Sequence, residues 1–149
     1  MTAARRRLRE STSRGYIVTP PRRLLLDTHS WIWWVEGSKR LGPVARKAIT
    51  GAAEVRVSAA SAWEIAIKIS RGRFEFPRDV AIIDELERDG FQPLPVDFVH
   101  TEAVRRLPRG HGDPFDRMLV AQAQIEGLTI VTVDPHFRRY DVPLLDASA

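Results

Sequence analysis

The chain contains no cysteine and no long apolar segment, and each absence excludes a class of protein. Without cysteine there can be neither a disulfide framework nor a thiolate metal site. No apolar run approaches the roughly 18 residues that a membrane-spanning helix needs. The arginines near the N-terminus are not followed by the apolar stretch of a secretory signal. We therefore expect a cytoplasmic protein that does not insert into a membrane.

Positive charge is distributed unevenly along the 149 residues. Residues 1–23 hold seven arginines and one acid, so they carry +6, and the rest of the chain carries −2 of the total of +4. This segment is polar and ends in prolines and arginines, which predicts a flexible basic N-terminal extension over 1–23 and one domain over 24–149. Because the basic charge lies in the extension, nucleic-acid binding by the domain would have to rest on a specific site.

Short apolar strands alternate with amphipathic helices from residue 24 onward. Strand patterns end near residues 27, 58, 96, 134 and 146, and helical patterns lie between them, over 30–37, 43–50, 59–72, 78–90, 97–107 and 113–127. Such alternation predicts an α/β fold with a mainly parallel sheet of about four or five strands, covered by helices on both faces. The two most apolar strands, which end at Asp27 and Asp134, should be neighbours in its centre.

Acidic residues stand where these elements would bring them together. Asp27 and Asp134 end the two central strands, and the carboxyl ends of parallel strands share one edge of a sheet. Asp116 begins the helix that leads into the Asp134 strand, so its first turn faces the same edge. Glu64 lies about two turns into the helix that Ser58 would cap, which is beyond capping reach.

Each acid also has a purely structural explanation. Asp27 could cap the next helix, Asp134 could start an Asp-Pro turn, and Glu64 could pair with Lys68 four residues on. The stretch HGDPFDRMLVAQA raises the same question, because Asp113 suits an N-cap and Asp116 the third helical position. Unrelated caps would not need to meet at one edge, however, and no cysteine or serine triad competes for the site.

Carboxylates gathered in one cleft repel each other unless a cation neutralises them. A set of oxygen ligands suits a hard ion, Mg²⁺ or Mn²⁺, which polarises a phosphoryl oxygen and acidifies bound water. We therefore expect hydrolysis of a phosphodiester, with these acids as ligands and one of them as a candidate general base. Four further residues are candidates for supporting roles: Thr28 and Thr132 as hydroxyls near the metal, and Arg117 and His111 as phosphate contacts.

Five segments resemble the PIN-domain ribonucleases, specifically the VapC-type toxins of bacterial toxin–antitoxin pairs. They are LLLDTHSWIWW, VSAASAWEIAIKISRGR, GFQPLPV, DPFDRMLVAQA and LTIVTVDPHFRRY, and they occur in this order over residues 24 to about 146. The resemblance implies a three-layer α/β/α PIN-like sandwich. It also implies that Asp27, Glu64, Asp116 and Asp134 form an acidic quartet that binds Mg²⁺ or Mn²⁺, with Asp113 as a cap that assists the site.

By the same resemblance the protein would be a bacterial endoribonuclease that arrests translation and growth until a VapB-type antitoxin neutralises it. It would form a homodimer, and the antitoxin rather than the toxin would bind DNA. One departure is Gly112, where relatives often carry Arg or Lys; this puts a phosphate contact in doubt. The chain has more tryptophan than a core of this size ordinarily needs: Trp31, Trp33, Trp34 and Trp63. These side chains predict either core packing or a groove for the antitoxin beside the Asp27 helix.

Two other functions compete with this prediction. A metal-dependent phosphatase of the HAD type also begins with an aspartate at a strand end, but it needs a second Asp two residues later. Neither His29 nor Ser30 supplies that residue. A catalytically silent interaction module on the PIN fold would lose acids, whereas this chain has all four.

Overall fold

The computed structural model describes residues 11–13, 16–18, 21–109 and 112–149. The domain opens with β3 (Arg23–Leu26), α1 (Thr28–Glu36), α2 (Pro43–Thr50), β4 (Glu54–Ser58) and α3 (Ala59–Ser70). It continues with α4 (Ile82–Arg88), β5 (Gln92–Leu94), α5 (Phe98–Arg105) and α6 (Pro114–Glu126). The chain then forms β6 (Thr129–Thr132), the short 3₁₀ helix η1 (Pro135–Arg139) and β7 (Leu144–Asp146).

The five strands form one parallel sheet in the order β5-β4-β3-β6-β7. β3 lies at its centre and pairs with β6, with Leu26 opposite Val131. The two strands predicted to be central neighbours are therefore neighbours, and the carboxyl end of each points to the same edge. The proline-containing β5 lies at the edge of the sheet, where the missing N–H of Pro93 is tolerated.

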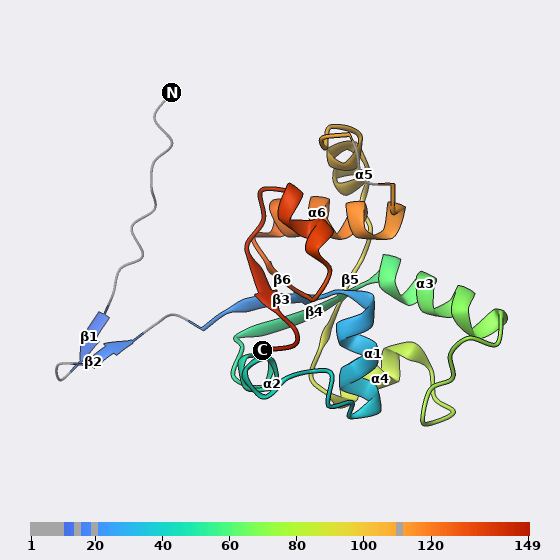
Figure 1. Ribbon diagram of the computed structural model, residues 1–149, viewed down its shortest axis with the longest axis horizontal. Coiled ribbons are helices and arrows are strands. Elements are labelled where there is room, and N and C mark those ends of the chain that lie inside the picture. Colours follow the sequence, from blue (N-terminus) through green and yellow to red (C-terminus); the bar gives the residue numbers. More distant parts are fainter. Residues whose placement is uncertain (1–10, 14–15, 19–20, 110–111) are drawn as a thin grey trace.

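Helices cover both faces of the sheet, so that the fold has the predicted three layers (Figure 1). α5 and α6 lie on one face, and α1, α2 and α4 lie on the other. Side chains alternate along β3: Leu24 and Leu26 pack with Trp31 of α1 on one face, while Leu25 packs with Leu119 of α6 on the other. Burying both faces explains why these strands read as nearly continuous apolar runs.

One helix is shorter than the sequence pattern indicates. The pattern predicts a helix over 78–90, but α4 begins only at Ile82. Arg78 instead lies in the preceding loop, and its guanidinium donates two hydrogen bonds to the fully buried carboxylate of Glu85, at 3.0 and 2.7 Å. This paired contact holds the segment between α3 and α4, a tertiary interaction that periodicity does not reveal.

Part of the predicted N-terminal extension is described. Residues Ser11–Ser13 (β1) and Tyr16–Val18 (β2) pair as a small antiparallel sheet, which Figure 1 shows away from the domain. The rest of residues 1–20 lies outside the described part of the chain. Flexibility of the extension, and the boundary at residues 23 and 24, stay predictions, although Arg23 is the first residue of β3.

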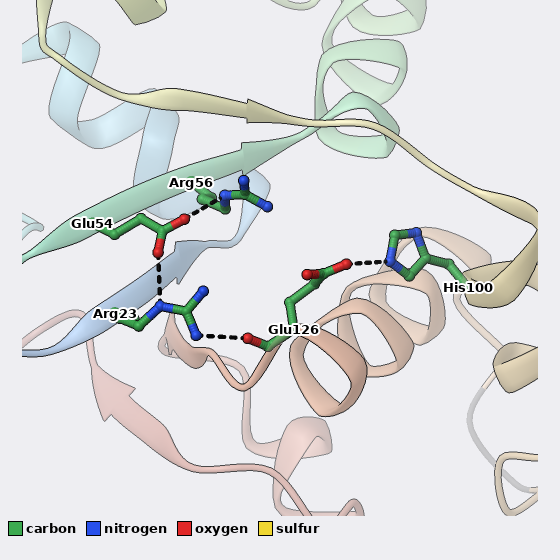
Figure 2. Close-up of polar contacts among 5 residues, drawn as sticks. All are labelled: Arg23, Glu54, Arg56, His100 and Glu126. Atoms are coloured by element: carbon green, nitrogen blue, oxygen red, sulfur yellow. Dashed lines mark hydrogen bonds and ion pairs between the residues drawn. The ribbon is translucent and has the colours of Figure 1, made fainter.

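A polar network ties the sheet to the α5–α6 layer at the edge opposite the acids (Figure 2). Glu54 accepts from Arg23 at 2.7 Å and lies 2.6 Å from Arg56. Arg23 also donates to the main-chain carbonyl of Glu126 at 2.8 Å, and the Glu126 carboxylate contacts the fully buried His100 ring at 3.0 Å. These contacts link β3, β4, α5 and α6. None of the helices in the described ranges combines the length and the apolar composition that a membrane span requires.

Candidate functional site

Asp27 occupies the end of the central strand and the start of α1. Its carboxylate accepts the main-chain N–H of Ser30 at 2.8 Å, which is the N-cap contact expected of an aspartate at this position. The side chain is 5% exposed, and burial raises the pKa of this carboxyl group, opposed by its hydrogen bonds to Ser30 and Thr132. Asp27 is therefore both a cap and a desolvated acid whose charged form is unfavourable in the absence of a cation.

The hydroxyl of Thr28 joins α1 to α3. It donates to the Glu64 carboxylate at 2.9 Å and lies 3.1 Å from the hydroxyl of Ser61. Lys68 lies 3.7 Å from the other Glu64 oxygen, which is the i,i+4 pair that the sequence predicts. Ser58 caps α3 as expected, by accepting from the amide of Ala60 at 3.0 Å. These contacts direct Glu64 toward the Asp27 end of the sheet.

Asp113 and Asp116 stand at the start of α6 and have different contacts there. Asp113 accepts the main-chain N–H groups of Phe115 and Asp116 at 2.9 and 3.0 Å, so it is the N-cap. Asp116 lies in the first turn of α6 and is half-buried. The Phe115 ring packs edge-on against Trp63 of α3 with centroids 5.3 Å apart, which ties this turn to the helix that carries Glu64.

Asp134 follows β6 and caps η1. Its carboxylate accepts from the His136 amide at 2.9 Å and contacts the His136 ring at 2.7 Å. The Thr132 hydroxyl accepts from the Asp134 amide at 3.0 Å, and it lies near enough to Asp27 to oppose the rise of that carboxyl group's pKa. One predicted supporting residue is therefore close to two of the predicted acids.

All four predicted acids stand on elements that end or begin at the same edge of the sheet. Their donor chemistry, carboxylate oxygen with flanking hydroxyls, fits a hard divalent cation. As the side chains lie, however, no group of three or more His, Asp or Glu residues in the described ranges is arranged to hold a metal ion. Asp27, Glu64 and Asp134 also accept hydrogen bonds that cap helices or join them, so these side chains hold the surrounding elements as well as lining this edge.

The structure does not place Arg117 or His111, the two predicted phosphate contacts, beside the acids in the described ranges. The Arg117 guanidinium turns toward main-chain carbonyls and a tyrosine hydroxyl instead of lying free beside the acids. His111 lies outside the described residues. Gly112 is exposed, and apart from its chain neighbours no atom of the described residues would lie within 4 Å of a Cβ placed there, so a longer side chain would meet no described neighbour.

Three of the four tryptophans pack in or against the core beside the Asp27 helix, which is the core-packing alternative. Trp31 is fully buried, and Trp33 and Trp34 pack against the same core; the Trp34 ring lies 5.3 Å from that of Phe91. The exposed member is Trp63, with 65% of its surface accessible. It lines an apolar hollow of about 710 Å³ between α3, α5 and α6.

Two contributors to the site do not emerge from the sequence patterns. Ser61 supports Thr28, and its position one turn before Glu64 was the available signal. His136 contacts Asp134 at 2.7 Å, and its place two residues later in the Asp-Pro-His turn could have indicated this.

Comparison with known proteins agrees with this fold and sequence. The PIN domain family matches residues 24–143. Ribonuclease VapC22 of Mycobacterium tuberculosis is 30% identical over 125 residues, which are 80% of this chain and 93% of that protein.

Among solved structures, FitAcB from Neisseria gonorrhoeae matches with a TM-score of 0.59 at 18% identity, over 83% of this chain and 97% of that one. DNA-bound VapBC from Salmonella typhimurium matches with a TM-score of 0.57 at 19% identity, over 84% and 98% of the two chains. The structural matches support the fold, and the sequence matches support the family. The chain therefore belongs to the PIN-domain family, and its predicted resemblance to the VapC-type members is confirmed.

Proposed function

We propose that this protein is a divalent-metal-dependent endoribonuclease and the toxin of a toxin–antitoxin pair. The observation that carries the proposal is the pairing of β3 with β6 in parallel, because it puts Asp27 and Asp134 at one edge with Thr132 close to both. The named ribonuclease activity of the VapC22 relative supports the same reaction class.

The chain's own residues supply the groups that phosphodiester hydrolysis needs. Asp27, Glu64, Asp116 and Asp134 would hold Mg²⁺ or Mn²⁺, which when bound supplies Lewis acidity toward a phosphoryl oxygen and lowers the pKa of water. Thr28 orients Glu64 through the 2.9 Å hydrogen bond, and Asp113 fixes the turn that carries Asp116. Burial of Asp27 gives it a raised pKa, so a cation at this edge would restore its charged form.

The first test is RNA cleavage with and without a chelator. We expect purified protein to cut single-stranded RNA when Mg²⁺ or Mn²⁺ is added, and excess EDTA to abolish cleavage until the metal is restored. A gel assay on a 5′-labelled RNA, with protein heated beyond unfolding as a control for contaminating nuclease, measures both. Cleavage that persists in excess EDTA would contradict metal dependence, and no cleavage under any metal would favour a silent interaction module on the same fold.

We further propose two protein partners, a second copy of the chain and a VapB-type antitoxin. Structural neighbours include VapBC from Salmonella typhimurium, which was solved bound to DNA. Exposed apolar side chains on α3 and around the start of α5 give a physical reason for a partner here. Trp63 and Val96 line the hollow and are 65 and 37% exposed, and Phe98 and Val99, which begin α5, are 92 and 56% exposed. Contiguous exposed apolar surface marks interaction sites.

Solution size and bacterial growth test these partners. The chain should sediment as a dimer, and Phe98→Glu should shift it to a monomer that keeps the wild-type circular dichroism spectrum, since Phe98 is 92% exposed in the single chain. Expression should arrest growth and translation, and co-expression of the cognate antitoxin should relieve the arrest. A Phe98→Glu variant that stays dimeric would place the dimer interface elsewhere, and growth unaffected by wild-type expression would argue against a toxin.

A further inference from the structure

Arg117 follows Asp116 on α6, and its side chain reaches toward other elements of the α5–α6 layer. Nη1 donates to the carbonyl oxygen of Pro108 at 2.8 Å and to the hydroxyl of Tyr140 at 3.1 Å. Nη2 faces the carbonyl oxygens of Val104 at 3.4 Å and Leu107 at 3.5 Å. Each terminal nitrogen of the guanidinium therefore has two protein acceptors.

The carbonyl acceptors belong to the end of α5 and the segment after it. Val104 lies in the last turn of α5, and Leu107 and Pro108 follow that helix. The carbonyl groups at a helix C-terminus lack partners within the helix and carry partial negative charge, so a guanidinium is favourable there. Arg117 thus holds residues 104–108 against the first turn of α6.

The fourth acceptor connects the same guanidinium to the other half of the site. Tyr140 is 8% exposed and ends η1, the turn that Asp134 caps. Asp116 is the residue before Arg117, and Asp134 lies at the opposite end of η1 from Tyr140. One guanidinium therefore links the turn that carries Asp116 to the turn that carries Asp134.

We propose that Arg117 is a positioning residue that sets the placement of Asp116 relative to Asp134 and does not bind the RNA phosphate. The inference rests on the proposed nuclease function for its catalytic consequence, but the structural link stands on the contacts alone. Nη1 and Nη2 hold four of the five N–H donors of an arginine, and the four acceptors occupy this end of the side chain. A phosphate contact would require giving them up.

The two roles predict different measurements on Arg117→Met, with Arg117→Lys as a second variant that keeps the charge but lacks the planar fork. If Arg117 positions the acids, we expect kcat to fall at least tenfold and the Kd for Mn²⁺ to rise by about tenfold, with KM for RNA nearly unchanged. The slope of log Kd for RNA against log salt should stay at the wild-type value. Arg117→Lys should not restore kcat, because one ammonium cannot reach the carbonyls and Tyr140 together.

Tyr140→Phe isolates the link to η1, since it removes only the hydroxyl. We expect a smaller fall in kcat, about threefold, in the same direction. Arg105→Met is the matched control, because Arg105 is an exposed α5 arginine whose guanidinium pairs with Glu102 on the same helix. That variant should leave kcat, KM and the Mn²⁺ Kd at wild-type values. Circular dichroism and Tm show which variants are folded.

Amide hydrogen exchange gives a readout that does not depend on activity. In folded Arg117→Met or Arg117→Lys, exchange should accelerate at the amides of residues 104–107 and 136–140 together, while the β3 and β4 amides stay protected. A raised KM, a salt slope reduced by about one and an unchanged Mn²⁺ Kd would mean a phosphate contact and overturn the proposal. Unchanged exchange at 136–140 would overturn it too. Wild-type protein that neither binds Mn²⁺ nor cleaves RNA would instead contradict the nuclease function and leave exchange to decide the role of Arg117.

Discussion

Asp116→Asn should reduce RNA cleavage by roughly 10²- to 10⁴-fold, the range for loss of an acid that acts in the reaction. Asp113→Asn, three residues earlier, should stay within a few-fold of wild type. The difference follows from their contacts: the Asp113 carboxylate accepts the amides of Phe115 and Asp116, and asparagine caps a helix equally well. Asp116 is not the cap, so its carboxylate is proposed to be needed for its charge.

This pair of variants is informative because both keep the shape of α6. Asparagine is nearly isosteric with aspartate, and the change removes one acid at the start of the helix in each case, which costs about 0.3–1 kcal/mol of helix stability. Single-turnover cleavage at saturating Mg²⁺, with Tm recorded for both proteins, separates chemistry from folding. A fully active Asp116→Asn would remove Asp116 from the acidic quartet, and an inactive Asp113→Asn would assign the cap a direct part in the reaction.

The central sheet and its helix layers could be predicted because the signals are local. Two apolar strands, each ending in an aspartate, dictate buried parallel neighbours, and the caps Ser58 and Asp113 stand where their helices begin. Hydrophobic periodicity failed to place the start of α4: the helix begins at Ile82, and Arg78 lies before it in a bidentate contact with Glu85. Local sequence carries no information about a partner that folding brings from another element.

In the site, too, some features follow from local sequence and others depend on how distant elements pack. That Asp27 and Asp134 would share an edge follows from strand direction, and Thr132 at their junction follows from the register. The partners of Arg117 do not follow from sequence, because they depend on how α5 packs beside α6. For the same reason Trp63 could not be distinguished from the buried Trp31: both belong to apolar helices, and only the packing decides which one is exposed.

Asp27→Asn should have two opposite effects: loss of cleavage by roughly 10²- to 10⁴-fold, and higher stability of the metal-free protein at neutral pH. The first follows from its place in the proposed quartet. The second follows from burial, since Asp27 is 5% exposed and desolvation raises the pKa of its carboxyl group. Asparagine can still accept the Ser30 amide, so the cap of α1 is kept while the buried charge is removed.

The pH dependence gives the sign of this stability effect. A carboxyl group with a raised pKa in the folded state binds its proton more tightly when folded than when unfolded. Its contribution to stability is therefore fully present below the unfolded pKa, near 3.8, and is lost as pH rises through the folded pKa. Asp27→Asn removes this dependence, so the stability advantage of the variant over wild type should grow from low pH to neutral pH and then level off.

Urea unfolding of both proteins in EDTA at several pH values between about 4 and 8 measures the difference in stability. Added Mn²⁺ should stabilise wild type more than the variant, because a cation at this edge offsets the buried charge. Equal stability across the whole pH range would mean that the Asp27 carboxylate is not desolvated in solution, and would remove the physical reason for a cation beside it.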